Sequence, residues 1–334
     1  MRITICTVVV WLAASLHTTA NAQAPLTVDI ENWVIYNFDV SDPSRLANNP
    51  AVTPPPTARN FISYATIADI TAVGGKPVKG LLVRRGTRID VQTAPMPGQA
   101  IGDVTRGFLD DGILEFLQTD GTPIGTITVL GFIFGPPPPG APVAQNSWNM
   151  AVTGGTGAFL GARGQMGGAA LPMGVDPGPR IFSSAAEDPS YRRIFGGRRA
   201  RMMLHLVPLA RPEILTTSTG PEIFHGGDFS PVSATNPARR GEVLIISASG
   251  LGPTRQRLDP GTPFPAEPLF EVNSPVEVRV NGVESQLINK IGWPGRENIY
   301  RVDFRVPEDT TPGVGILQLT AAWITSSEVQ VPIR

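Results

Sequence analysis

Residues 150–165 read MAVTGGTGAFLGARGQ, and this stretch decides the fold that the sequence predicts. The residues around it favour two strands, at Ser147–Thr153 and Phe159–Gly167. Glycine adopts a positive φ without steric cost, so the glycines between the strands allow a tight turn. Phe159 then re-enters the core. The stretch therefore predicts a β-hairpin with an aromatic anchor.

More strands are expected on both sides of this hairpin. Trp33–Val40 alternates in polarity, with Asn37 and Asp39 on one face. Two expected hairpin turns are Asp110-Asp111-Gly112 and Thr119-Asp120-Gly121. About eight strands in one unit predict a closed antiparallel barrel over residues 26–211, because closure removes exposed sheet edges. The remaining strands of this set are Asn60–Ile70, Gly80–Thr93, Gly102–Phe108, Ile113–Gln118, Gly125–Phe134 and Arg199–Leu209.

A second β-rich pattern follows from Glu222 onward. Asn281-Gly282 is typical of a type I′ turn between two strands. About seven short strands in this region are typical of an immunoglobulin-like β-sandwich over 222–334, with 212–221 as a linker. The predicted fold class is all-β, an eight-stranded antiparallel barrel followed by that sandwich. The clearest of its strands are Glu242–Ser249, Val276–Val280, Val283–Ile288, Tyr300–Val306, Gly315–Ile324 and Glu328–Ile333.

The N-terminus predicts export. Arg2 precedes an apolar run from Ile3 to Leu16, and Ala20-Asn21-Ala22 is a small-residue cleavage site. Residues 1–22 are therefore predicted to be a signal peptide, and the protein to be periplasmic or extracellular. The run is too short for a permanent membrane span, and none is predicted elsewhere. The single cysteine, Cys6, lies inside this run, so thiol chemistry is not expected after cleavage.

Composition narrows the function classes. Charged residues are 16% of the 334 and the formal net charge is -1. Intrinsic disorder needs lower hydrophobicity and a higher net charge, and a nucleic-acid binder needs a basic excess. The sequence therefore predicts a folded protein that does not bind nucleic acid.

The pattern "GGTG-x-F-x-x-A-R-G" within 150–165 resembles the signature hairpin of the allene oxide cyclases and of the related plant dirigent proteins. Both families are eight-stranded barrels with a small-molecule cavity. Trp33–Asp42 resembles, more loosely, the first strand of the cyclases. The resemblance implies such a barrel over 26–211, and by analogy a homo-oligomer formed through the barrel.

The C-terminal region resembles a second family. "RRGEVLIISASGLGPT", "VEVRVNGVESQLI" and "IYRVDFRVPEDTTPG" are similar to the C-terminal module of exported bacterial proteins that is related to the IPT/TIG immunoglobulin-like domains. Such modules space, present or adhere, so the resemblance implies a spacer or presentation role for 222–334.

The cyclase resemblance implies candidate ligand-binding residues. The first cyclase strand projects a glutamate and, two residues later, an asparagine into the cavity. Matching Tyr36 to the aromatic residue before that pair places Asn37 and Asp39 at these positions. The alternative is that both are solvated at the barrel rim, since unpaired polar burial costs about 1–3 kcal/mol. The family's buried cysteine has no counterpart after residue 22, which is a departure from a faithful allene oxide cyclase.

Arg163 falls on the arginine that dirigent proteins carry in the hairpin. The resemblance implies contact with an anionic or phenolic ligand. The alternative is a structural arginine that pairs with a neighbouring carboxylate or stacks on Phe159. The dirigent acidic residues have no match here, which puts guidance of radical coupling in doubt.

Other chemistry is not indicated. His205 and His225 have no partner ligand at metal spacing, so no metal site and no cofactor are predicted. Three functions stay open: a barrel that binds a small, largely apolar molecule, a cyclase or isomerase without metal or cofactor, and a structural or adhesive protein that binds a cell-surface or extracellular polymer. Catalytic residues are not assigned.

Overall fold

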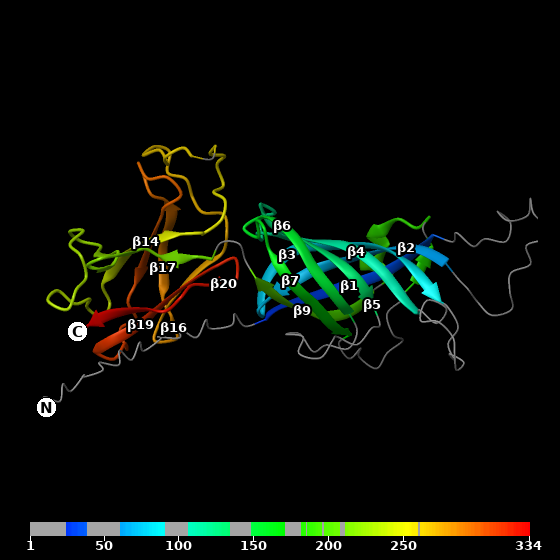
Figure 1. The fold of residues 1–334 in the computed structure, drawn as a ribbon, viewed down its shortest axis with the longest axis horizontal. Helices are drawn as coiled ribbons and strands as arrows, with labels where there is room; N and C mark the ends of the chain where they lie inside the picture. The colour runs from blue at the N-terminus through cyan, green and yellow to red at the C-terminus, as the bar shows by residue number, and fades with distance from the viewer. Residues whose placement is uncertain are drawn as a thin grey trace, which may run out of the picture.

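The computed structural model describes residues 25–38, 61–90, 106–133, 148–170, 182–184, 186–195, 197–207, 211–259 and 261–334. The predicted signal peptide lies outside these residues. Within them the chain is almost entirely β-structure, arranged as a barrel and a separate C-terminal group of sheets (Figure 1). The all-β prediction is confirmed.

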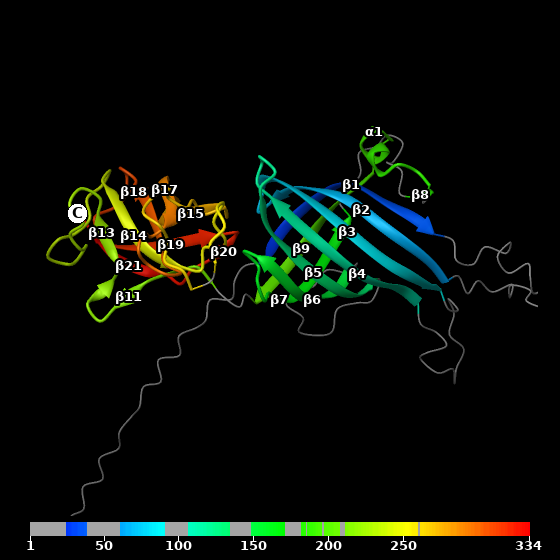
Figure 2. The same cartoon turned by 90° about the horizontal axis from the view of Figure 1, so that it is seen from above.

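The first unit is a closed antiparallel barrel, as predicted. Neighbouring strands pair in the order β2-β3-β4-β5-β6-β7-β9-β1, and pairing of β1 with β2 closes the ring (Figure 2). A short strand β8 adds to β1 in parallel, next to the place where β9 begins. The eight barrel strands are β1 Leu26–Phe38, β2 Phe61–Val73, β3 Lys76–Asp90, β4 Arg106–Leu117, β5 Pro123–Ile133, β6 Trp148–Gly157, β7 Arg163–Ala170 and β9 Arg198–Val207, and the added strand is β8 Phe182–Ser184.

Side chains along the barrel strands alternate between the buried interior and the solvent-exposed outer face. Along β9, the inward residues are fully or nearly fully buried, while Arg199 and Arg201 face solvent. These two arginines pair with Glu31, at 3.0 Å, and with Asp29, at 2.6 Å, on the outer face of β1. Arg199 and Arg201 therefore lie on the outer face of β9, with Ala200 between them on the inner face. The inward residues of β9 are Ala200, Met202, Leu204 and Leu206.

One predicted turn is wrong. Asp110-Asp111-Gly112 is not a hairpin turn but lies in the middle of β4, which pairs continuously with β3 from Arg106 to Leu117. The two predicted strands on either side of it are one strand. Asp-Asp-Gly is a common turn sequence, which explains the prediction. In the structure Gly112 instead lies opposite Arg84 of β3, where the absence of a side chain leaves room inside the barrel. The turn at Thr119-Asp120-Gly121 is confirmed, with Gly121 at φ 90°.

The predicted hairpin at 150–165 is present. β6 ends at Gly157 and β7 begins at Arg163, with Gly157 and Gly161 at positive φ in the turn. Phe159 is 1% exposed and packs on Phe116, with 5.2 Å between the ring centroids. The second strand starts four residues later than predicted, because Phe159 itself belongs to the turn.

A short helical segment covers part of the barrel exterior. It consists of η2 Pro189–Tyr191 and α1 Arg192–Phe195. Arg192 and Arg193 both pair with Asp69 of β2, at 2.5 and 2.9 Å, and Asn32 donates to the same carboxylate at 3.0 Å. In the part of the chain that the structure describes, no helix is long and apolar enough to cross a membrane.

The C-terminal part (residues 211–334) contains two larger sheets that share one hydrophobic core. Asn281 and Gly282 have φ of 52° and 79°, which confirms the predicted turn between two strands. The immunoglobulin-like assignment stays a prediction. One sheet holds β10 Glu213–Ile214, β13 Ile223–His225, β14 Val243–Ser249, β17 Gln286–Gly292 and β18 Tyr300–Arg305, and the other β15 Val276–Val280, β16 Val283–Glu284, β19 Gly313–Ala321, β20 Ile324–Thr325 and β21 Val329–Ile333.

The predicted linker carries β-structure. β10 pairs with β14, and β11 Thr216–Thr217 pairs with β12 Gly220–Pro221 as a two-stranded sheet. Residues 213–221 are therefore integrated with the C-terminal part.

The C-terminal part closes one end of the barrel. Trp323 lies between β19 and β20 and packs on Phe116, with 5.7 Å between the ring centroids. Its neighbours Ala322 and Ile324 are buried in the same hydrophobic cluster as the barrel interior. The side chain of Asn273 donates to the carbonyl of Pro123 at this end of the barrel. Figure 1 shows β20 directed at the barrel end. We call Phe116, Phe159 and Trp323 the floor.

Candidate functional site

Two neighbouring strands place complementary residues inside the barrel. β3 contains Arg84 and Gly86, and β4 contains Asp110 and Gly112. Because the strands are antiparallel, Arg84 lies opposite Gly112, and Gly86 lies opposite Asp110. Each large polar side chain therefore faces a position without a side chain. This reciprocal register makes room for a buried ion pair.

Arg84 and Asp110 form that ion pair, with 3.4 Å between Nη2 and Oδ2. Both residues are only 1% exposed. The hydroxyl of Tyr64 donates a hydrogen bond to Oδ1 of Asp110. The guanidinium of Arg84 also lies over the indole of Trp33, 5.7 Å from the ring centroid, which is a cation–π distance. With the fully buried Thr66, which pairs with Arg84 across β2 and β3, these residues form what we call the inner cluster.

The glycines are required for this geometry. A Cβ at Gly86 would overlap both the carboxylate of Asp110 and the phenol of Tyr64. A Cβ at Gly112 would lie 2.6 Å from Cγ of Arg84. Both contacts are too short for side-chain atoms. Positions 86 and 112 must therefore be glycine for the polar side chains opposite them to fit.

Burial shifts the proton affinity of both partners. It raises the pKa of Asp110 to about 8, and the nearby carboxylate of Asp111 adds to the rise. The same burial lowers the pKa of Arg84 to about 9. The ion pair itself opposes both shifts, and the desolvation of two fully enclosed groups outweighs it. The inner cluster therefore holds a carboxyl group that exchanges its proton close to neutral pH.

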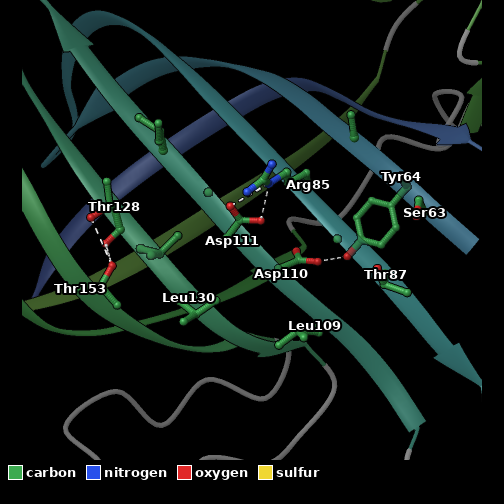
Figure 3. Close-up of a pocket in the computed structure, with 15 residues that line it drawn as sticks. Ser63, Tyr64, Arg85, Thr87, Leu109, Asp110, Asp111, Thr128, Leu130 and Thr153 are labelled. Atoms are coloured by element: carbon green, nitrogen blue, oxygen red, sulfur yellow. Dashed lines mark hydrogen bonds and ion pairs between the residues drawn. The ribbon is translucent and has the colours of Figure 1, made fainter. Parts of the chain in front are cut away.

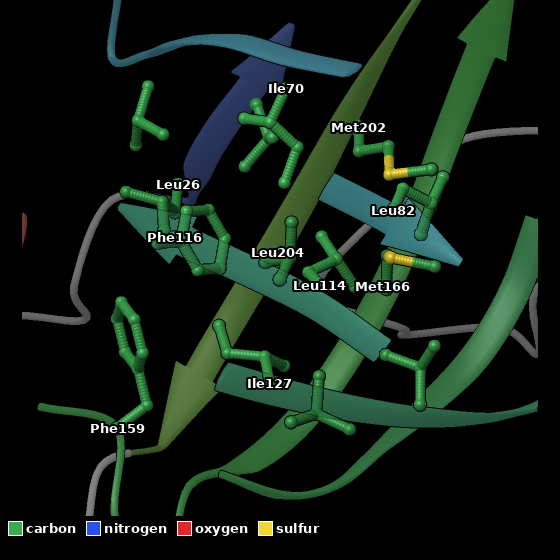
Figure 4. Packing of buried hydrophobic residues seen from close by; sticks show 14 of the residues in the cluster. Leu26, Ile70, Leu82, Leu114, Phe116, Ile127, Phe159, Met166, Met202 and Leu204 are labelled. Atoms are coloured by element: carbon green, nitrogen blue, oxygen red, sulfur yellow. The ribbon is translucent and has the colours of Figure 1, made fainter. Parts of the chain in front are cut away.

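The apolar half of the barrel lies on the side of the floor. Figure 4 shows Phe116, Phe159, Leu204 and Ile127 filling this half. Met166 and Met202 lie close to Leu82 and Leu114 in the same view. These side chains are all buried and belong to one hydrophobic cluster, so the floor half of the barrel is an apolar core.

The outer wall of the barrel carries a groove of about 830 Å³ over β2 to β6 (Figure 3). Arg85 and Asp111, the neighbours of the inner pair, form an ion pair in it, in which Nε of Arg85 donates to both carboxylate oxygens at 2.9 Å. Exposed Leu109, Ile113 and Leu130 provide its apolar surface. Asp110 and Tyr64 also border this groove, although both residues are buried.

The residues predicted from the family resemblances are spread out. Asn37 lies near the end of β1, and its backbone pairs with Tyr64 of the inner cluster. The side chain of Asn37, and all of Asp39, lie outside the described residues. Arg163 is exposed at the start of β7, at the barrel end next to the floor, and donates to the carbonyl of Ala162 at 2.9 Å. Arg163 is thus not brought together with Asn37.

The sequence contains a signal for the inner cluster that was missed. Arg84-Arg85-Gly86 and Asp110-Asp111-Gly112 have the same spacing of one charge and one glycine on a single strand face. In an antiparallel pair this spacing gives the reciprocal register seen here. The interpretation of the second triplet as a turn concealed it.

The histidines are apart from this cluster. His205 lies on β9, opposite Gln165 of β7, and His225 pairs with Glu242 at 2.9 Å in the C-terminal part. Among the described residues, no group of three or more His, Cys, Asp or Glu side chains is placed to hold a metal ion.

Comparison of the chain with family models, with curated proteins and with solved structures found no match.

Proposed function

We propose that the barrel binds a small, largely apolar molecule in the half away from the floor, with the inner cluster holding its polar end. The observation that carries this proposal is the enclosed trio of Tyr64, Arg84 and Asp110 on the interior face of the wall. Ligand sites are mostly apolar with a few convergent polar groups of shifted pKa, and this half of the barrel has that character.

The neighbouring side chains suit a ligand of variable shape. Met150 is buried and belongs to the same cross-strand row as Asp110 through Gly131. Methionine is unbranched and polarisable, so it repacks around different apolar surfaces at low cost. A molecule with one oxygen-bearing end and an apolar body matches this lining.

One observation favours turnover as a second candidate function. Asp110, with its pKa raised to about 8, accepts a hydrogen bond from Tyr64 in an enclosed site. A carboxyl group of this kind donates and accepts protons near neutral pH. A cyclase or isomerase, which moves a proton within one substrate, needs no further cofactor, and the family resemblance points in the same direction.

The sequence also supports a proposal for where the protein acts and what its C-terminal part is. We propose export through the signal peptide at 1–22, a periplasmic or extracellular location, and an immunoglobulin-like C-terminal module. In place of a pure spacer, that module supplies Trp323 to the floor. It thereby takes part in closing the floor end of the barrel.

The test is native mass spectrometry of the protein purified from its own host, followed by denaturing extraction of what it carries. We expect a stoichiometric small molecule. Asp110→Asn, which keeps an acceptor for Tyr64, should lose it. Asp111→Asn is the matched control, since Asp111 faces the outer groove and should retain it.

An empty wild-type protein that also fails to bind 8-anilinonaphthalene-1-sulfonate would contradict the proposal. Equal retention of the ligand in both variants would place the site elsewhere. A bound molecule that returns chemically rearranged after incubation would support the isomerase, and loss of rearrangement with retained binding in Asp110→Asn would assign Asp110 the proton transfer.

A further inference from the structure

The C-terminal part carries two adjoining hollows that share Arg239. One has a volume of about 640 Å³ and is lined by polar groups that include His225, Asp228, Ser230 and Asn236. The other, of about 480 Å³, is lined by Arg239, Arg240, Glu308 and Arg334. We call the two together the polar groove. Figure 2 shows β13, which ends at His225, on the side of the C-terminal part away from the barrel.

In the described part of the chain, the side chains of three arginines of the groove have no partner. Arg239, Arg240 and Arg334 are all exposed. Within the ranges that the structure describes, their guanidinium groups make no hydrogen bond or ion pair. Other arginines of this part are paired, such as Arg296 with Glu222 at 2.9 Å and Arg301 with Asp303 at 2.7 Å. Three like charges left together favour an anionic ligand.

The rest of the groove is neutral or acidic and is already ordered. Asp228 accepts hydrogen bonds from the backbone N–H and the hydroxyl of Ser230, at 2.9 and 2.7 Å. The amide of Asn236 donates to the same hydroxyl at 3.2 Å. Glu242 fixes the ring of His225. A ligand would therefore meet hydrogen-bond donors and acceptors on a preformed surface.

This combination selects among anions. The carboxylates of Asp228, Glu242 and Glu308 repel a chain that carries a charge on every unit, such as a nucleic acid or a polyphosphate. They accept hydrogen bonds from hydroxyl groups, however, and the arginines bind carboxylates in a bidentate manner. An acidic sugar offers both hydroxyls and a carboxylate on one ring.

From this match we propose that the polar groove binds an acidic polysaccharide, with a uronate carboxylate on Arg239 and Arg240 and sugar hydroxyls at the Asp228–Asn236 side. This site is independent of the barrel. It gives the protein an attachment point on the side of the C-terminal part away from the barrel.

The test is calorimetric titration of the full protein with oligogalacturonate, and with dextran and polyphosphate for comparison. We expect binding of oligogalacturonate that weakens with salt, and little binding of either comparison polymer. Arg239→Glu should weaken it at least tenfold, because a charge-assisted hydrogen bond is lost and a repulsive charge is added. Arg257→Glu is the matched control, since Arg257 is 92% exposed in its side chain and lies outside the groove.

Three outcomes would overturn the proposal. They are no binding of oligogalacturonate at millimolar concentration, equal weakening by the two variants, and polyphosphate binding as tight as that of oligogalacturonate. The last would assign the groove to polyanions in general. Circular dichroism of both variants, with unchanged spectra, shows that any loss is local.

Discussion

The indole of Trp323 lies nearly parallel to the phenyl ring of Phe159, with 6.3 Å between the ring centroids and 6° between the ring planes. One ring belongs to the C-terminal part and the other to the barrel hairpin. Aromatic pairs add about 0.5–1.5 kcal/mol to the burial of their surfaces. The two units are therefore joined through the barrel's own core.

Trp323→Ala should lower the free energy of unfolding of the barrel by about 2–4 kcal/mol, since it opens a void beside Phe116 and Phe159. Urea denaturation followed by circular dichroism measures this. Lys76→Ala is the control, because Lys76 forms an ion pair with Glu277 across the same junction, at 2.8 Å, with 46% of its side chain exposed. Its loss should cost less than about 1 kcal/mol. Equal effects of the two variants would contradict the role given to the floor.

Removing one member of the inner pair should lower the free energy of unfolding more than removing both. Above pH 8, where Asp110 is ionised, Arg84→Met leaves a carboxylate enclosed without its cation and should cost about 3–5 kcal/mol. Arg84→Met combined with Asp110→Asn should recover much of this loss, because no charge is then left in the barrel. A double-mutant cycle by urea denaturation measures the coupling. Simple additivity of the two single changes would show that the pair does not act as a unit.

Gly86→Ala should prevent the inner cluster from forming, because its methyl group overlaps Asp110 and Tyr64. We expect destabilisation of about 2 kcal/mol or more, typical of overpacking in a close-packed interior. Gly227→Ala is a matched control, since a Cβ there meets no atom within 4 Å. Thermal unfolding of both variants measures the difference. A Gly86→Ala protein as stable as Gly227→Ala would refute the packing argument.

The stability of the barrel should depend on pH through Asp110. Its pKa rises from 3.8 to about 8 on folding, so the folded state binds the proton more tightly. The contribution of Asp110 is therefore complete below about pH 4 and is lost as the pH rises through about 8. The pKa of Arg84, lowered to about 9, leaves that group charged across this range.

Asp110→Asn removes this titration. Relative to wild type, the variant should gain stability between pH 5 and pH 8, as measured by urea denaturation at the two values. A relative loss over the same interval would show that the attraction of Arg84 outweighs burial and holds Asp110 ionised.

Much of the fold was accessible from the sequence because it depends on local patterns. The glycines at 154–157 with Phe159 identify a hairpin, and Asn281-Gly282 identifies a type I′ turn. The inner cluster is different, since it depends on the register between β3 and β4. A triplet such as Asp110-Asp111-Gly112 suits both a turn and a strand, and only its pairing with Arg84-Arg85-Gly86 decides between them. The floor likewise joins Phe159 to Trp323, which no local pattern connects.

The short strand β8 gives the barrel a seam. β9 accompanies β1 only up to Trp33, and beyond it three residues of β8 pair with Ile35, Tyr36 and Asn37. The opposite edge of β1 is held by β2 along nearly its whole length. Beyond Trp33, the edge of β1 that faces β8 therefore depends on three backbone pairs of β8, and loss of β8 would leave the described end of β1 as an unpaired strand edge.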